Sequence, residues 1–561
     1  MPGAVRRTRV ALVIALSLIA CERTPSTTAA QGNTRAADYY RQFTQAQDLA
    51  KKEKFADAAA LYDRLTKAYP EDAEVWIELG KALAKAQQYR AAAESYSRAL
   101  ALGGEYPGML SYRVARVYAL EGDKTQSLAW LAKSLAKPLE FRPEIARDQA
   151  FAAWRDDEAF RKLAGIAPKR SLSREQEWNY DLDYFVAEVR RLHFAYRDHP
   201  LPDGFEDDIR KLRSRIPQLS NASMRVEVQR FLARLGDGHT RLQEGTARQI
   251  PLSLYDFSDG MFVTDAPSGC ECIGDRVVAI GSTPIQTAAQ KITPFLSVDN
   301  AMGVRLQAPA YLRYTEYLRA AGISSSDEVV LSLEGTRGKR QYTAKTIDDP
   351  AYDRGLFPAK LANAGPVPRY MQHRNDNYWF ELLPDGKTLY FQFNQVLDES
   401  GNPIEKFAVK LRAALGTSTV RNLIVDMRHN GGGNLNLFTP LLRSIITFET
   451  THDRSGLYVI TGRRTFSAAQ VFINELDRYT KAVFAGEPSS SRPNFIGESA
   501  RTALPYSGLE MTISTRYHQT DDQDQRTWIA PKIPVELSSL DYFANRDPML
   551  DAVLEVIRAG K

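Results

Sequence analysis

The sequence predicts a multidomain protein that combines a helical front part with a layered α/β domain at its C-terminal end. From residue 37 to about residue 165, apolar residues recur at helical spacing with an internal period. Residues 250–346 contain short apolar strands bounded by Gly and Pro, which predicts a small β-rich module. From about residue 387, apolar strands alternate with amphipathic helices, which is typical of a parallel core covered by helices.

The length, charge and cysteine content of the chain limit the classes of protein to which it can belong. A chain of 561 residues is long enough for three or four domains. With 73 basic and 68 acidic residues, the net charge of +5 gives no reason to expect a nucleic-acid partner. Three cysteines are too few for a disulfide framework.

The first residues have the pattern of a bacterial export signal. Arg6, Arg7 and Arg9 precede the apolar run "VALVIALSLIA", which is too short for a comfortable membrane span. The run ends in "LIAC", which resembles a bacterial lipoprotein lipobox. The resemblance implies that residues 1–21 are a signal peptide, that Cys21 is lipidated, and that the protein is anchored in the cell envelope facing the periplasm. Residues 22–36 would then be a polar linker. The alternative is an ordinary secretory signal in which the cysteine occurs by chance.

The repeat in the front part has a period of 34 residues. Phe55, Ala58 and Tyr62 recur as Tyr89, Ala92 and Tyr96. This pattern resembles the tetratricopeptide repeat, an all-α solenoid whose helix pairs pack small residues against aromatic ones. We assign it to residues 37–165. Such solenoids usually bind a protein partner, and the alternative is a helical spacer between membrane and enzyme.

A histidine follows the next helical region, residues 170–246. In "LGDGHT", glycines 236 and 238 end a helix and His239 comes directly after them. A histidine on such a turn can face a cleft and accept a proton near neutral pH, although a core or surface histidine is the simpler interpretation of this motif alone.

The β-rich module, residues 250–346, resembles a PDZ domain in its segment "IGDRVVAIGSTPIQTAAQKI". PDZ domains bind extended peptide ends at a sheet edge. The module lacks a clear Gly-Leu-Gly-Phe loop for the peptide carboxylate. Cys270 and Cys272 are separated by one residue, so we expect buried free thiols rather than a strained disulfide.

Two turns in the C-terminal domain suit acyl transfer. Gly431–Gly433 follow the buried strand "VRNLIVDMR" and precede a helix, where backbone N–H groups can hold developing negative charge. Ser467 lies at another strand-to-helix turn, and its own N–H or that of Ala468 could be a second donor. The alternatives are a tight turn for the glycines and a helix cap for the serine.

Taken in order, "LGDGHT", the PDZ-like segment, "LIVDMRHNGGGN" and "TFSAAQVF" resemble the carboxy-terminal processing and tricorn-core serine peptidases. This family includes tail-specific proteases and the interphotoreceptor retinoid-binding proteins. The resemblance covers roughly residues 173–555. It implies a crotonase-like (ClpP-like) spiral ββα core in residues 370–558, with Ser467 as nucleophile and with Gly431, Gly432 and Ala468 around the oxyanion.

The resemblance also narrows the choice of general base. One version of the chemistry uses a lysine about 25 positions after the serine, but Arg492 occupies that place and stays protonated. Lys481 lies roughly 20 Å from Ser467 along the helix, which is out of reach. The tricorn-like version places a histidine before the PDZ-like segment, where His239 lies. His429 in the glycine loop is the rival.

A histidine base usually needs an acid to orient it. The resemblance points to the segment before Pro531, where Asp522 and Asp524 are candidates and Asp524 is preferred. Glu498 is the other candidate, and Lys532 replaces the aspartate that is usual after the proline.

The leading hypothesis is therefore a serine-type peptidase of the cell envelope that cleaves peptides or protein C-terminal regions. Ser467 would be the nucleophile and His239 the base, with no cofactor and no metal. The expected partners are a peptide or protein substrate, a protein bound by the repeats, and the membrane through the lipid anchor. The alternative is an inactive peptide- or protein-binding scaffold on the same fold.

Overall fold

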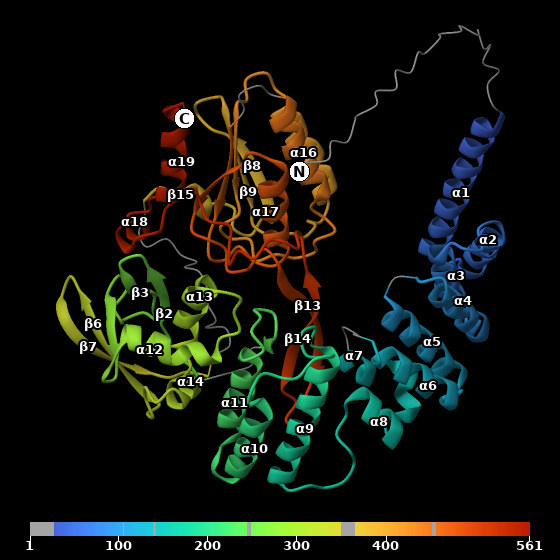
Figure 1. Cartoon of the computed structure of the whole chain (residues 1–561), viewed down its shortest axis with the longest axis horizontal. Coiled ribbons are helices and arrows are strands. Elements are labelled where there is room, and N and C mark those ends of the chain that lie inside the picture. Colours follow the sequence, from blue (N-terminus) through green and yellow to red (C-terminus); the bar gives the residue numbers. More distant parts are fainter. Residues whose placement is uncertain are drawn as a thin grey trace, which may run out of the picture. The chain divides into compact units, whose positions relative to one another are not determined.

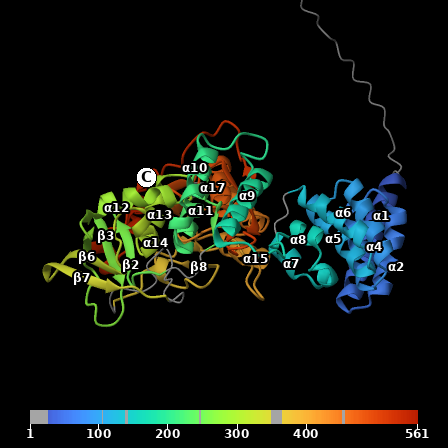
Figure 2. The ribbon, with the colours of Figure 1, turned by 90° about the horizontal axis from the view of Figure 1, so that it is seen from below.

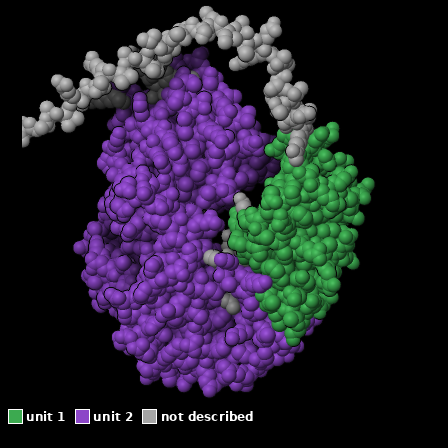
Figure 3. All heavy atoms as spheres, turned by 45° about the vertical axis from the view of Figure 1, so that its right-hand side comes forward, with its two compact units in different colours: residues 1–130 green, residues 131–561 purple. Residues whose placement is uncertain are grey.

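The computed structural model describes residues 27–104, 106–137, 142–243, 248–348, 365–451 and 456–560. The signal peptide and Cys21 lie outside the described residues. In the described ranges no helix is both long enough and apolar enough to cross a membrane. The chain divides into two compact units, residues 1–130 and 131–561, which are coloured separately in Figure 3.

Unit 1 is a stack of antiparallel helix pairs (Figure 1). Its helices are α1 (Thr27–Lys51), α2 (Phe55–Ala68), α3 (Ala73–Lys85), α4 (Tyr89–Ala101) and α5 (Pro107–Glu121), and α6 (Lys124–Leu135) continues into unit 2. Helix α1 begins inside the stretch that we expected to be a linker. The repeating residues Ala58, Tyr62, Ala92 and Tyr96 are all buried in one core, as the 34-residue period predicts.

Unit 2 begins with a helical region, part of which packs on a three-stranded sheet. The helices are α7 (Arg142–Arg147), η1 (Gln149–Trp154), α8 (Glu158–Ala164), α9 (Arg174–Leu192), α10 (Phe205–Arg215), η2 (Ile216–Gln218) and α11 (Asn221–Ala233). The antiparallel sheet has the order β1 (Arg241–Leu242), β14 (Glu510–His518), β13 (Phe495–Ala503). Figure 1 shows this sheet beside α9 and α11, with which it shares one hydrophobic core. Residues far downstream of His239 thus lie next to it.

The β-rich module is an antiparallel sheet with helices at its side. The strand order is β2 (Ser253–Phe257), β3 (Gly260–Asp265), β4 (Arg276–Ile280), β6 (Glu328–Gly335), β7 (Gly338–Lys345), and β5 (Thr283–Pro284) pairs with β4. Its helices are α12 (Ile285–Ile292), η3 (Thr293–Phe295), α13 (Ala301–Tyr311) and α14 (Thr315–Ala320). Figure 2 shows α12 and α13 beside the sheet.

The expectation of free thiols in this module is wrong, because Cys270 and Cys272 form a disulfide. Their Cα atoms are 5.2 Å apart, which is within the usual range for a disulfide. The residue between them, Glu271, has a φ of 44°. This left-handed turn brings the two cysteines together, and their spacing in sequence does not reveal it.

The C-terminal domain is a six-stranded sheet between helices. The order is β15 (Ile533–Pro534), β12 (Val483–Gly486), β11 (Gly456–Thr461), β10 (Asn422–Asp426), β9 (Thr388–Phe393), β8 (Tyr378–Leu382), and only β8 is antiparallel to its neighbour. The helices are α15 (Ile404–Leu415), α16 (Thr439–Thr451), α17 (Ala468–Tyr479), α18 (Ser539–Phe543) and α19 (Pro548–Arg558), with η5 (Arg369–Met371) before the sheet.

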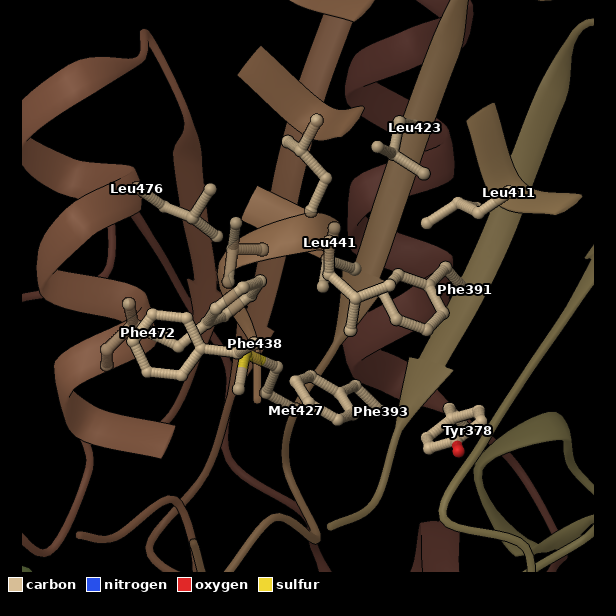
Figure 4. Packing of buried hydrophobic residues seen from close by; sticks show 14 of the residues in the cluster. Tyr378, Phe391, Phe393, Leu411, Leu423, Met427, Phe438, Leu441, Phe472 and Leu476 are labelled. Atoms are coloured by element: carbon tan, nitrogen blue, oxygen red, sulfur yellow. The ribbon is translucent and has the colours of Figure 1, made fainter. Parts of the chain in front are cut away.

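Both faces of the central strands are covered, as the continuously apolar sequence of β10 predicts. In Figure 4, Phe391 and Phe393 of β9 and Leu423 of β10 point toward Leu441 and Phe472 of the helices on one face. A smaller cluster packs α19 on the other face. Because β10 and β11 are parallel neighbours, the loops at their carboxyl ends lie side by side.

Substituting Gly80→Ala tests the packing of unit 1. Alanine normally stabilises a helix by about 1 kcal/mol relative to glycine. Here a Cβ at position 80 would lie 2.7 Å from the Tyr96 ring. We therefore expect a net loss of about 1–3 kcal/mol from overpacking, measured as a lower unfolding midpoint by circular dichroism. Lys81→Ala, at an exposed neighbouring position, should change the midpoint little. A midpoint raised by Gly80→Ala would contradict this packing.

Candidate active site

The turn that carries His239 is built around the buried carboxylate of Asp237. Its Oδ1 accepts the N–H of His239 at 2.9 Å, the N–H of Thr240 at 2.7 Å and the hydroxyl of Ser514 at 2.7 Å. Its Oδ2 lies 2.9 Å from Nε2 of the buried His193. Burial alone would raise the pKa of Asp237, but His193 and Ser514 lower it overall. The buried carboxylate of Asp237 therefore fixes the backbone of His239.

Ser467 occupies the N-cap position of α17 but does not cap the helix with its side chain. Its backbone has φ 58° and ψ −124°, a conformation that is strained for a non-glycine residue. Its N–H donates to Oγ of Ser491 at 3.2 Å. Its own Oγ lies 3.0 Å from Nε2 of His239. The structure thus brings together two residues that are 228 positions apart.

Two aromatic rings hold the imidazole of His239. Phe466, next to Ser467, stacks on one side with 4.4 Å between ring centroids. Phe495, at the start of β13, stacks at 5.5 Å, and His518 of β14 stacks on Phe495 in turn. The ring is therefore positioned by its neighbours on β13 and on the Ser467 loop.

The imidazole of His239 is neutral at physiological pH. Burial lowers its pKa to about 4. The charge of Asp237 acts in the opposite direction, while Arg241 and His518 lower the pKa further. A neutral imidazole is the form that can accept a proton from a hydroxyl group.

His429, the rival base, lies elsewhere. It is buried, and its Nε2 is 2.9 Å from the carbonyl oxygen of Tyr370. Burial lowers its pKa well below the usual range, and the nearby Arg374 and Arg428 lower it as well. No hydrogen bond connects its ring to Ser467 within the described ranges.

The glycine loop lies against Ser467, but not with the donors that we expected. The N–H of Gly432 donates to Oδ1 of Asn430 at 2.9 Å, so it is already used inside the loop. A Cβ on Gly432 would lie 2.8 Å from Cβ of Ser467, which explains the need for glycine. Gly431 does not line the cavity at Ser467, whereas Gly433 and Ala468 do. The expectation that Gly431 and Gly432 donate their N–H groups to the oxyanion is therefore corrected, because Gly433 and Ala468 are the residues that face the cavity.

The cavity at Ser467 has a volume of about 220 Å³. Its lining combines the Ser–His pair, apolar side chains and polar groups from β13 and β14: His239, Gly433, Leu435, Ser467, Ala468, Phe495, Glu498, Ser499 and His518. Ser467 and His239 therefore face the same cavity.

The expected orienting acids do not contact His239. The carboxylate of Asp524 binds Arg526 at 2.7 Å, and that arginine also pairs with Asp477. Asp522 lies exposed in the same segment. Glu498 lines the cavity, but its carboxylate faces Nε2 of His518 at 3.8 Å. Among the described residues no carboxylate is hydrogen-bonded to the His239 ring. The expectation for Asp524 failed because Arg526 binds its carboxylate, which the spacing of the residues in the sequence does not reveal.

Several residues around the site were not expected from the sequence. Asp237 could have been found, because an Asp two residues before a turn residue often caps its backbone. Ser491, Phe495 and Asp299 had no signal, because they reach the site through pairings between distant segments. Arg492 donates to the carbonyl oxygen of Asp299 at 2.9 Å.

Comparison with known proteins supports two parts of this description. The family model described as tetratricopeptide repeat matches residues 43–109 and 77–139, so the repeat prediction is confirmed. A crystal structure of a serine-to-alanine mutant of CPAF matches with a TM-score of 0.51 and 13% identity, covering 68% of this chain and 98% of that chain. Over that share of its length the chain has the fold of CPAF.

Further solved structures resemble a similar share of the chain. Mature CPAF has a TM-score of 0.49 at 12% identity, covering 69% of this chain and 98% of that chain. The tricorn protease has a TM-score of 0.35 at 16% identity, covering 69% of this chain and 37% of that chain. No curated protein sequence matches the chain.

Nuclear magnetic resonance of histidine tests the electrostatics of the site. With selectively ¹³C-labelled histidine, the chain has only seven ring signals, and His239→Gln assigns the one of interest. Because burial lowers its pKa, the His239 ring should stay neutral as the pH falls and should protonate only near pH 4. A full protonation shift of the ring with a midpoint near the ordinary value of about 6.5 would show that the ring is not desolvated.

Proposed function

We propose that the protein is a serine-type peptidase in which Ser467 and His239 carry out acyl transfer. The observation that carries the proposal is the 3.0 Å approach of the His239 Nε2 to the Ser467 Oγ at the cavity. A serine that merely capped α17 would direct its oxygen to the backbone N–H groups of the first turn, and this side chain makes no such bond. The shared fold with CPAF agrees with the proposal.

The proposed reaction begins with attack of the Ser467 oxygen on a peptide carbonyl carbon. His239 Nε2 takes the hydroxyl proton as the C–O bond forms. The imidazolium then gives this proton to the leaving amine as the C–N bond breaks, which leaves an acyl-enzyme. A water molecule, deprotonated by the same nitrogen, hydrolyses the ester and restores the serine.

Backbone N–H groups would stabilise the oxyanion formed in each step. Ala468 is the first residue of α17, where N–H groups have no partner inside the helix and the helix dipole favours negative charge. Gly433 faces the same cavity from the glycine loop. We assign the oxyanion site to these two residues. Gly432 contributes by leaving room for the loop to approach Ser467.

The Ser–His pair works here without a hydrogen-bonded carboxylate on the imidazole. Stacking by Phe466 and Phe495 fixes the ring plane, and Asp237 fixes the backbone of His239. Asp237 also supplies the negative charge that favours the imidazolium. These contacts orient His239, which is the role that we expected for Asp524 or Glu498.

The other parts of the chain would bring substrates and partners to this site. We propose that the β-rich module is PDZ-like and binds extended peptide segments, that the α/β domain is a crotonase-like core, and that the tetratricopeptide repeats bind a protein partner. The substrate class is peptides or protein C-terminal regions.

Active-site labelling tests the proposed chemistry. A fluorophosphonate probe should label the wild-type protein, because the neutral His239 activates the Ser467 hydroxyl. Ser467→Ala should abolish labelling. His239→Gln should slow labelling by a factor of at least about 100, since general base catalysis typically contributes that much. Gel fluorescence over time gives the rate constants.

Two matched substitutions act as controls for this test. His429→Gln changes the rival histidine, and Asp524→Asn changes a carboxylate that binds Arg526. Both should label within about threefold of the wild type, as expected for residues outside the reacting pair. Loss of labelling in His429→Gln with normal rates in His239→Gln would reverse the assignment of the base, and loss of labelling in Asp524→Asn would restore Asp524 as the orienting acid.

The location also remains a proposal, and it rests on the "LIAC" sequence. We propose that Cys21 carries a lipid that anchors the protein in the bacterial cell envelope, with its domains facing the periplasm. Metabolic labelling with an alkyne fatty acid in a bacterial host should mark the full-length protein and should be lost in Cys21→Ser. Equal labelling of both, or of neither, would contradict lipidation at this residue.

A further inference from the structure

The segment Asp299–Asn300 of the β-rich module is anchored in the catalytic domain. Both side chains are buried. The Asn300 amide nitrogen donates to the carbonyl oxygens of Ser489 at 3.1 Å, Ser491 at 3.3 Å and Thr527 at 3.2 Å. Its Oδ1 accepts two N–H groups at the start of α13. This asparagine therefore fixes the position of its neighbour, Asp299.

Asp299 binds the turn that carries His239. Its Oδ1 accepts the N–H of Gly238 at 2.7 Å. A Cβ on Gly238 would lie 3.3 Å from this oxygen and 2.8 Å from the Phe466 ring, so only glycine allows so close an approach. The peptide group between Asp237 and Gly238 is thus held by a carboxyl group from another part of the chain.

The same segment reaches the Ser467 side of the pair. Ser491 accepts the side-chain N–H of Asn300 with its carbonyl oxygen, and its hydroxyl accepts the backbone N–H of Ser467. Arg492 donates to the carbonyl oxygen of Asp299. Two adjacent residues of the module are therefore connected to both segments that carry the Ser–His pair, Asp299 through Gly238 and Asn300 through Ser491.

We infer that Asp299 is a positioning residue for the His239–Ser467 pair, and this inference rests on the proposed peptidase function. Through Gly238 it holds the turn so that the His239 Nε2 stays within hydrogen-bonding distance of the Ser467 Oγ. When ionised, it also adds a negative charge at the N–H of Gly238, the residue before His239, on the same side of the pair as the imidazolium that forms during proton transfer. Such a charge lowers the energy of the transition state.

The ionisation of Asp299 falls in the physiological range. Burial raises its pKa to about 7, and the charge of Asp237 adds to this effect. Gly238 N–H, Ser491 and Arg492 act in the opposite direction. Asp237 and Arg492 are the charged groups that face it from the turn and from the Ser491 loop. Asp299 is thus neutral below pH 7 and negative above it, so the labelling rate should rise through pH 7.

The test compares the full-length wild type with Asp299→Asn and Asp299→Ala. Second-order rate constants for fluorophosphonate labelling are measured from pH 5.5 to 9. Asparagine keeps an oxygen acceptor for Gly238, so Asp299→Asn should slow labelling above pH 8 by less than about tenfold, and the inflection near pH 7 should disappear. Asp299→Ala loses the acceptor and should be about 100-fold slower, the usual cost of misplacing a catalytic group. With a peptide substrate, kcat should fall while KM changes little.

A control in the same module separates positioning from folding. Asp275 is also buried in the β-rich module but pairs with Arg340, and Asp275→Asn should leave the labelling rate unchanged. The raised pKa of Asp299 means that the folded state binds a proton that the unfolded state releases between about pH 4 and 7. Ionised Asp299 is thus unfavourable to folding at pH 8, and Asp299→Asn should not lower the unfolding midpoint there.

A second readout does not depend on peptidase activity. In the wild type the signal of the neutral His239 ring should show a second, smaller change in chemical shift with a midpoint near pH 7, as Asp299 ionises, and this change should be absent in Asp299→Asn. Wild-type labelling rates and an unchanged pH profile in both Asp299 variants would overturn the inference. So would a His239 signal with no inflection near pH 7. Absence of any labelling in the wild type would refute the proposed function, and the His239 signal would still decide the role of Asp299.

Discussion

The hydrogen bond between Nε2 of His239 and Oγ of Ser467 is the interaction on which the catalytic part of the structure depends. Its two residues come from a turn after α11 and from the loop before α17. Neither segment could hold this geometry alone. Asp237 caps the histidine turn, and strands β13 and β14 place Phe495 and Ser514 against it. The three-stranded sheet therefore acts as the bridge between the helical region and the α/β domain.

The strained backbone of Ser467 requires support from its surroundings. A non-glycine residue in such a conformation costs on the order of 1–3 kcal/mol. In the same loop, the buried Arg463 pairs with Glu487 and donates to the carbonyl oxygen of Asp256 in the β-rich module. Leaving a buried charge unpaired costs about 3–5 kcal/mol, which exceeds the strain. These contacts anchor the start of the loop, in which the serine oxygen is directed toward His239 instead of the helix.

The sequence predicted those features that follow from local periodicity. The 34-residue repeat, the buried strand β10 and the strand-to-helix turns at Gly432 and Ser467 were all recognisable, because each depends on residues close together in the chain. The disulfide between Cys270 and Cys272 was not predicted, because it depends on the left-handed backbone of Glu271, which the sequence does not reveal. The expectation that Asp524 orients His239 was wrong, because Arg526 binds its carboxylate. Asp299, Ser491 and Phe495 could not be found, because their contacts depend on how three separate parts of the chain pack.

The most direct test of the account is to locate the residue that reacts with a fluorophosphonate. After labelling and trypsin digestion, the peptide from Thr465 to Arg478 should carry the probe, and fragmentation should place the adduct on Ser467. The same peptide from His239→Gln should be almost unmodified. An adduct on another serine, or cleavage of peptide substrates by a Ser467→Ala protein, would contradict the central claim that Ser467 and His239 form the reacting pair.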